Sequence, residues 1–258
     1  MSFRDLLLAI ALFINTPNPA HDTAIAITTR PEAGEDGEKF ILPPKADLRR
    51  LLRAAQSHDN TGHADAVVRD FMFVGLRASE LRGLPLRTLS LDLSQPKLRV
   101  DQRADEKDEI GPAKTKMSRR DIVLGPETVT ALKQWLEARP ASEFVFPNEA
   151  GNVWSYQNLW NRFWVPLMNR AGLVTDEPAS ATVRTWSKEQ ANFKQPRFGL
   201  HMLRHVYASL QIEQGVQPKR LQALMGRATL KLTMDTYGHL WPNEDEDQRA
   251  AKVEIVLG

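Results

Sequence analysis

Apolar residues recur with a helical period over most of the chain. In 46–55, for example, Leu48, Leu51, Leu52 and Ala55 fall on one stripe of a helix, because positions three and four apart share a face. The same spacing continues downstream. It predicts helices over 46–55, 64–76, 127–138, 156–172, 201–214, 218–225 and 230–240, with a short additional helix opened by Ser79 and Glu80.

One stretch follows a different period. Between residues 88 and 124, the segments 89–93, 97–100 and 120–124 alternate apolar and polar residues, with turn-forming residues between them. Alternation is typical of strands that bury one face. We therefore expect a small antiparallel sheet of about three strands, and the fold class is mainly α with a small antiparallel β-sheet insert.

The first forty residues differ from the rest. Arg4 and the apolar run 6–14 resemble the start of a secretory signal, but no small-residue cleavage site follows. The run is also shorter than the ~20 apolar residues that span a bilayer. We interpret 1–14 as a helix that needs a packing partner. We predict a linker over residues 15–39, because most of the prolines and glycines there lie near an acidic stretch.

Composition removes several kinds of chemistry. The 258 residues include no cysteine, which excludes disulfides, thiolate catalysis, iron–sulfur clusters and cysteine-based zinc sites. A balance of 34 Lys+Arg against 32 Asp+Glu leaves a net charge of +2, which by itself does not indicate a nucleic-acid partner. The charges are nevertheless sorted along the chain. Residues 101–109 are acidic, 110–120 are basic, and 180–240 hold nine bases against three acids.

Two distant segments gather candidate functional groups. Arg77 lies at the junction of two predicted helices, where a side chain can face a cleft or simply the solvent. His201, Arg204 and His205 share one side of a predicted helix by their i, i+3, i+4 spacing. Cations on one face repel each other unless an anion or a carboxylate lies opposite. A phosphate is the natural candidate, because guanidinium groups bind it through two hydrogen bonds.

The basic segment 110–120 offers a second candidate surface. Its cations lie between two predicted strands, so we expect a hairpin tip that reaches a nucleic-acid backbone, with a solvated loop as the alternative. The cations are Lys114, Lys116, Arg119 and Arg120. Further along, Tyr237 is one of only three tyrosines.

Four segments together carry a family resemblance. GLRASEL at 75–81, AKTKMSRR at 113–120, HMLRH at 201–205 and TMDTYGHL at 233–240 occur in an order and spacing similar to those of the tyrosine recombinases, the phage integrase family. The resemblance covers about 40–242, which it identifies as a catalytic domain followed by a tail, 243–258. It also implies that 1–14 is a remnant of the last helix of an N-terminal core-binding domain, in a truncated chain or a fragment.

The resemblance assigns roles residue by residue. It implies that Arg77 and Arg204 grip the scissile phosphate and that Tyr237 is the nucleophile. Lys114 is the implied proton donor to the leaving 5′ oxygen. Lys116, two residues on and therefore expected on the same face of a strand, is the alternative donor.

The resemblance also bears on further residues. His201 is expected to serve the phosphate or the proton of the tyrosine, and Glu80 to support the site without touching DNA. Lys116, Arg119 and Arg120 are expected to bind DNA. Arg227 departs from the family, which usually has Leu-Gly-His or Leu-Gly-Trp where this chain reads Met225-Gly226-Arg227. Arginine also donates hydrogen bonds to phosphate, so Arg227 either replaces the usual residue or impairs the site.

The implied function is site-specific recombination or integration of DNA. Such an enzyme cleaves and rejoins strands through a 3′-phosphotyrosine intermediate, without a metal, ATP or another cofactor. The expected partner is double-stranded DNA, with a homotetramer on synapsed DNA, a monomer or weak oligomer without it, and no membrane. The expected location is the cytoplasm of a bacterium, for a bacterial or phage-encoded protein. Two alternatives remain: a recombinase-derived DNA-binding protein with impaired or no cleavage, and a topoisomerase that acts alone.

Overall fold

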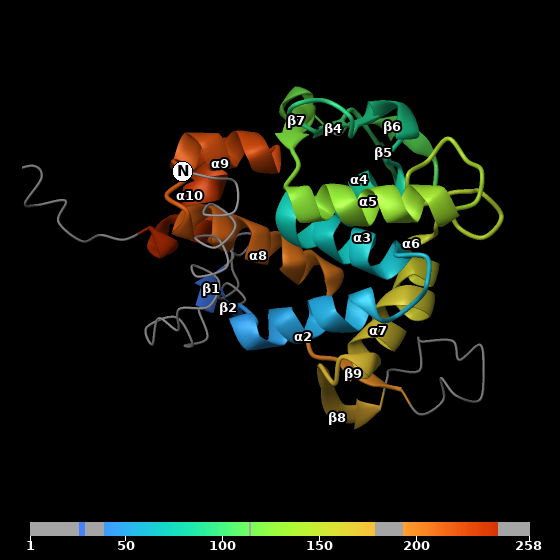
Figure 1. Cartoon of the computed structure of the whole chain (residues 1–258). Coiled ribbons are helices and arrows are strands. Elements are labelled where there is room, and N and C mark those ends of the chain that lie inside the picture. The colour runs from blue at the N-terminus through green and yellow to red at the C-terminus, as the bar shows by residue number, and fades with distance from the viewer. Residues whose placement is uncertain (1–25, 29–38, 114, 179–192, 242–258) are drawn as a thin grey trace, which may run out of the picture.

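Helices make up most of the structure, as the apolar period predicts (Figure 1). The computed structural model describes residues 26–28, 39–113, 115–178 and 193–241. Its α-helices are α2 (Lys45–Gln56), α3 (His63–Arg69), α4 (Ala78–Arg82), α5 (Pro126–Ala138), α6 (Tyr156–Asn158), α7 (Val165–Arg170), α8 (Leu200–Glu213), α9 (Pro218–Met225) and α10 (Leu230–Tyr237). Within these described ranges, none of the helices has the length and apolar character that crossing a bilayer requires.

Two of the predicted helices contain a wider π-helical turn. The helix expected over 64–76 is α3 continued by η2 (Asp70–Val74), and it ends at Gly75 in the left-handed conformation. The helix expected over 156–172 is α6, then η5 (Leu159–Trp164), then α7. Pro166 lies just after η5 and lacks a backbone N–H, so the helix cannot keep its regular hydrogen bonding there.

The predicted three-stranded sheet is present. Its antiparallel order is β3-β4-β7, from β3 (Leu89–Ser90), β4 (Lys97–Val100) and β7 (Arg120–Val123). A second pair was not predicted: β5 (Gln102–Ala104) and β6 (Ile110–Pro112) form their own hairpin. Its tip is the acidic part of 101–109. The basic segment is therefore not a hairpin tip, and it joins β6 to β7 through the 3-10 turn η4 (Lys116–Ser118).

Two more strand pairs lie outside the predicted sheet. β1 (Ala26–Thr28) pairs with β2 (Lys39–Ile41), so part of the segment interpreted as a linker forms a strand. β8 (Val174–Pro178) pairs with β9 (Lys194–Pro196) beside α7. The predicted helix 1–14 and the tail 243–258 lie outside the described residues.

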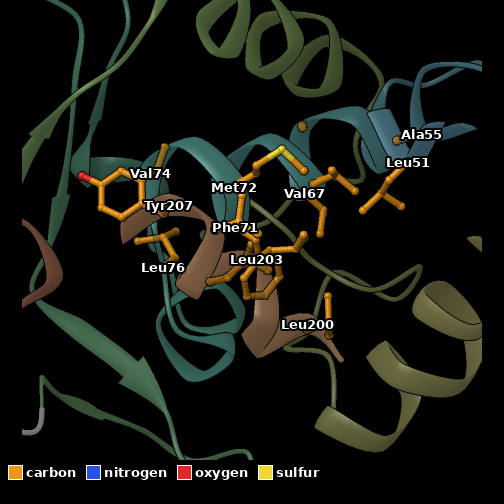
Figure 2. Packing of buried hydrophobic residues seen from close by; sticks show 14 of the residues in the cluster. Leu51, Ala55, Val67, Phe71, Met72, Val74, Leu76, Leu200, Leu203 and Tyr207 are labelled. Atoms are coloured by element: carbon orange, nitrogen blue, oxygen red, sulfur yellow. The ribbon is translucent and has the colours of Figure 1, made fainter. Parts of the chain in front are cut away.

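The centre of the core is the contact between η2 and α8 (Figure 2). Phe71 from η2 packs near Leu203 of α8, and both side chains are buried. Fully burying such a side chain stabilises the fold by roughly 1.5–3 kcal/mol. This packing fixes α8, which carries His201, Arg204 and His205, against the segment that leads into Arg77.

Candidate active site

One cleft brings the distant candidate residues together. It has a volume of about 950 Å³, and its lining includes Arg77, His201, Arg204 and Arg227. These side chains come from the start of α4, from α8 and from the residue after the α9 cap. Acidic residues of the β5–β6 tip and the half-exposed Tyr156 line another part of the same cleft. The four basic groups are therefore neighbours in space, as the sequence argument requires.

Arg77 is fixed at the start of α4. Its backbone N–H donates to Glu80 Oε2 at 2.9 Å, and its Nη1 donates to Glu80 Oε1 at 2.7 Å. About a third of its side chain, 34%, remains exposed to the cleft. Just before it, Gly75 has φ 70°, and a Cβ there would fall 2.3 Å from the Tyr207 ring. The glycine thus permits both the turn and the close approach of α8.

Arg204 is buried beneath the cleft. Its Nη1 donates to the Gly75 carbonyl and its Nη2 to the Met225 carbonyl. Burial first, and then the charge of Arg77, lowers the pKa of Arg204 to about 9, while Glu80 acts in the opposite direction. A pKa of about 9 still leaves the guanidinium charged at pH 7.

The prediction that Arg120 contacts DNA is wrong. Arg120 is buried, and its Nη1 and Nη2 donate to the two carboxylate oxygens of Glu80 at 3.0 and 2.9 Å. Burial alone would raise the pKa of Glu80, but the charge and hydrogen bonds of Arg120, with the charges of Arg204 and Arg77, lower it to about 2. Glu80 therefore holds two arginines and lies under the cleft, where structural support is expected.

The remaining cations of the basic segment divide into two groups. Lys116 and Arg119 are exposed, which keeps both available to a polyanion. Lys116 lies in the turn η4, so the expectation that it shares a strand face with Lys114 is not met. Lys114 itself lies outside the described residues.

His201 opens α8 at the mouth of the cleft. Desolvation of its ring, and then the charges of Arg204, Arg77 and Arg227, lowers its pKa to about 4. The imidazole is therefore neutral at pH 7, with one nitrogen able to donate and the other able to accept a hydrogen bond.

Tyr237 lies at the end of α10 and is fully buried. Its hydroxyl lies 2.9 Å from His205 Nδ1 and accepts from Arg227 Nη2 at 3.3 Å. Burial raises the pKa of the phenol, and Arg227 and Arg204 offset part of the rise. Burial, and then the charges of His201 and Arg227, lowers the pKa of His205 to about 3. Both groups are consequently neutral at pH 7.

Arg227 connects the cleft with the tyrosine. It lines the cleft, and its guanidinium carbon lies 4.8 Å from the centre of the Tyr237 ring. Its Nη1 also donates to Thr236 Oγ1 at 2.8 Å and to the Leu232 carbonyl. The residue that departs from the family pattern is thus bonded to three parts of α10.

Sequence reasoning missed two residues of this site. The i, i+3, i+4 spacing groups His205 with His201 and Arg204 but indicates no role for it. In the structure its ring lies against the Tyr237 hydroxyl of α10. The composition of 110–120 presents Arg120 only as one cation of a basic segment. The alternation of 120–124 could have corrected this, because it places residue 120 on the same strand face as the buried Ile122.

Comparisons with known proteins agree with this geometry. Residues 44–244 match the model of the phage integrase family. The chain is 24% identical over 206 residues to tyrosine recombinase XerC of Actinobacillus pleuropneumoniae serotype 7 (strain AP76), covering 77% of this chain and 55% of XerC. It is 27% identical over 207 residues to the transposase from transposon Tn916 of Enterococcus faecalis, covering 78% of this chain and 48% of the transposase. The chain spans about half the length of the curated relatives it matches.

Solved structures have the same fold. The Tn1549 transposon integrase in complex with circular intermediate DNA superposes with a TM-score of 0.62 at 20% identity, covering 86% of this chain and 69% of the integrase. The XerA recombinase superposes with a TM-score of 0.56 at 18% identity, covering 96% of this chain and 72% of XerA. With a family match over most of its length, the protein belongs to the phage integrase family, the tyrosine recombinases.

Proposed function

We propose that this protein cuts and rejoins DNA strands in site-specific recombination, through a covalent 3′-phosphotyrosine at Tyr237. The main support is that four side chains line one cleft: Arg77, His201, Arg204 and Arg227. Arg227 also donates a hydrogen bond to the Tyr237 hydroxyl. The DNA in the Tn1549 integrase complex supports double-stranded DNA as the partner.

In this proposal the arginines make the phosphodiester open to attack. Its negative charge repels nucleophiles, and Arg77 and Arg204 neutralise that charge as it grows in the transition state. Both guanidinium groups are already oriented by Glu80, Gly75 and Met225, so little reorganisation accompanies the reaction.

The cleavage step balances with groups of this chain. The Tyr237 oxygen forms a bond to phosphorus, and the bond from phosphorus to the 5′ oxygen breaks. We assign the proton for that leaving oxygen to Lys114, with Lys116 as the alternative donor. The phosphodiester energy is kept in the phosphotyrosine, so a 5′-hydroxyl can reverse the step without ATP.

The phenol must lose its proton before it attacks. His205 has a pKa of about 3, far below that of a phenol, so it is a poor acceptor and holds the hydroxyl in a neutral, resting position. His201 is neutral and faces the cleft. A phosphate bound in the cleft offsets the arginine charges that, after burial, hold the pKa of His201 at about 4, so we assign proton removal to His201 once DNA is bound and Tyr237 has moved out of its buried position.

Recombination also needs several protomers. We propose a homotetramer on synapsed DNA and a monomer or weak oligomer without DNA. Sedimentation of the protein with and without its site DNA measures this. Complete recombination by a species that stays monomeric on DNA would contradict the proposed assembly.

A second function has specific support. Tyr237 is fully buried, and Arg227 occupies the position where the family usually has His or Trp. Both observations favour a recombinase-derived protein that binds DNA without cleaving it.

A covalent-adduct assay separates the two functions. The protein is incubated with a pool of random-sequence duplexes, denatured, and any DNA attached to protein is sequenced to recover the site. We expect adducts that Tyr237→Phe abolishes and that Tyr207→Phe, a change at another buried tyrosine, leaves intact. DNA binding without any adduct would favour the second function. Adducts without strand exchange between two duplexes would favour strand relaxation by a topoisomerase.

A further inference from the structure

The C-terminal end of α9 binds three different arginines. The Leu224 carbonyl accepts from Arg120 Nε at 2.7 Å. The next carbonyl, of Met225, accepts from Arg204 Nη2, and the one after it, of Gly226, accepts from Arg77 Nη2 at 3.2 Å. The arginines come from β7, from α8 and from the start of α4. Three consecutive carbonyls thus hold side chains from three separate parts of the chain.

Helix geometry explains why the carbonyls are available. The last four carbonyls of a helix have no partner within it, and their end of the helix carries partial negative charge. Gly226 ends α9 in the left-handed conformation, with φ 57°. A Cβ on Gly226 would meet Arg120 Nη1 at 3.0 Å and Ser118 Cα at 3.1 Å. The end of α9 therefore fits closely against the start of β7.

Arg120 is the arginine that joins these parts. Its three nitrogens donate to the carbonyls of Leu224 and Ser118 and to both oxygens of Glu80. Glu80 in turn binds Arg77. Arg120 is therefore linked to Arg77 in two ways, because both arginines bind Glu80 and both bind carbonyls at the end of α9. Arg204 binds the end of α9 as well.

We propose that Arg120 is a positioning residue for the recombination reaction, which orients Arg77 and Arg204 toward the scissile phosphate without touching DNA. The inference rests on the proposed function above. Four acceptors around one side chain require a planar group with several fixed donors, which arginine provides and lysine does not. Its effect should consequently appear in the chemical step and not in DNA binding.

The test uses the full chain and the DNA site recovered as covalent adducts. Arg120→Lys and Arg120→Gln are compared with Arg99→Lys, a change on the adjacent strand β4 at an exposed arginine paired with Asp121. Single-turnover adduct formation is measured on two duplexes, one with a normal scissile phosphate and one with a methylphosphonate there. The methylphosphonate lacks the negative charge that Arg77 and Arg204 are proposed to neutralise.

We expect the Arg120 variants to form adducts about 100-fold more slowly on the phosphate, because misplacing a group by about 1 Å costs that much. On the methylphosphonate the deficit should shrink to less than about a tenth of that value. The DNA affinity of the Arg120 variants should stay near that of the unmodified protein. Arg99→Lys should form adducts at nearly the unmodified rate. The ratio between substrates is taken within each preparation, so a lower folded fraction cancels.

Two results would overturn the inference alone. They are an equal deficit on both substrates, which indicates general disruption, and normal cleavage of the phosphate by Arg120→Lys. If the unmodified protein forms no adduct on either duplex, the proposed function fails, and the positioning role fails with it. The two failures are therefore distinguishable.

Discussion

The two halves of the candidate site are held in different ways. In the arginine cluster, defined as Arg77, Arg120 and Arg204, every guanidinium is bonded to Glu80, to the end of α9 or to Gly75. In α10, the hydroxyl of Tyr237 is directed at His205 and away from solvent. The hydrogen bonds of the arginine cluster are thus formed without DNA, whereas the hydroxyl of Tyr237, the proposed nucleophile, is buried.

Packing gives the same contrast. The arginine cluster lies against the η2–α8 core, where nearly every apolar side chain is buried. On α10, Leu230, Leu232 and Met234 are exposed, and the hydroxyl of the buried Thr233 has no hydrogen-bond partner within the described part of the chain. A helix with few buried contacts rearranges at low cost in free energy. In the proposed reaction, we therefore expect exposure of Tyr237, and not assembly of the arginines, to limit the rate of cleavage.

The largest effect is expected at Glu80. Glu80→Gln leaves Arg120 and Arg77 without their carboxylate, and breaking a buried ion pair costs about 3–5 kcal/mol in free energy of unfolding. Urea unfolding at pH 7 measures the loss. Because the pKa of Glu80 is lowered to about 2 from 4.5, its contribution is present above pH 4.5 and disappears as the pH falls toward 2. The difference between the two proteins should therefore close at low pH.

Glu127→Gln is the matched control. Glu127 pairs with the buried Arg69, but its own side chain is 76% exposed and Arg69 keeps Asp65 as a second partner. We expect a loss below about 1 kcal/mol in free energy of unfolding. Equal losses in free energy of unfolding at the two glutamates would show that the ion pairs of the arginine cluster stabilise the fold no more than a partly exposed ion pair does.

The second effect concerns Arg227, which lines the cleft together with Arg77 and Arg204 and is hydrogen-bonded to α10. Arg227→Ala should slow adduct formation about 100-fold, the usual cost of removing one donor to a developing charge. Arg227→His should retain most of the activity, because imidazole also donates to phosphate. Single-turnover adduct formation measures both. Faster cleavage by Arg227→His would show that the natural residue impairs the site, and no change in Arg227→Ala would show that it only covers Tyr237.

The sequence predicted one of the two regions better than the other. The helix spacing puts His201 and Arg204 on one side of a helix, and the family motifs single out Arg77; all three line the same cleft in the structure. Arg120 and the end of α9 could not be paired from the sequence, because their contact joins residues 104 apart. The resting position of Tyr237 was equally hidden, since burial of a polar nucleophile depends on tertiary packing and leaves no local pattern.

A third test uses pH to probe the tyrosine region, through His205. Between pH 6.5 and about 4, His205, with a pKa of about 3, stays neutral in the folded protein, whereas the unfolded chain binds a proton there. Stability therefore falls with decreasing pH, by up to about 1.4 kcal/mol per pH unit for each such histidine. His63, whose pKa burial lowers to about 4, adds to the slope. In this range Glu80 and Arg204, with pKa values of about 2 and 9, keep their charges.

Urea unfolding of His205→Gln across this pH range isolates that contribution. We expect a shallower decline than in the unmodified protein, with His239→Gln, a change at an exposed histidine, as the surface control. An identical slope for His205→Gln would mean that protonation of His205 costs nothing, and that the tyrosine region is already open in solution.

The smallest effect is expected at Asp70, in the segment η2 that packs against α8. Asp70 is fully buried in η2, and among the residues that the structure describes neither of its carboxylate oxygens has a hydrogen-bond partner. Burial raises its pKa well above 3.8, so the folded protein holds a proton that the unfolded chain releases as the pH rises. This lowers stability at neutral pH. Asp70→Asn removes that linkage and should raise the free energy of unfolding by about 1 kcal/mol at pH 8, and by less toward pH 4.

Asp121→Asn, at an exposed aspartate whose hydrogen bond with Arg99 lowers its pKa, is the control and should not stabilise the protein. Adduct formation decides what the Asp70 result means for the two regions. If the arginine cluster is already in its working arrangement, a more stable η2 leaves the cleavage rate unchanged. If Asp70→Asn is more stable but slower, η2 and α8 must move during the reaction, and the division into a preformed cluster and a mobile tyrosine helix is wrong.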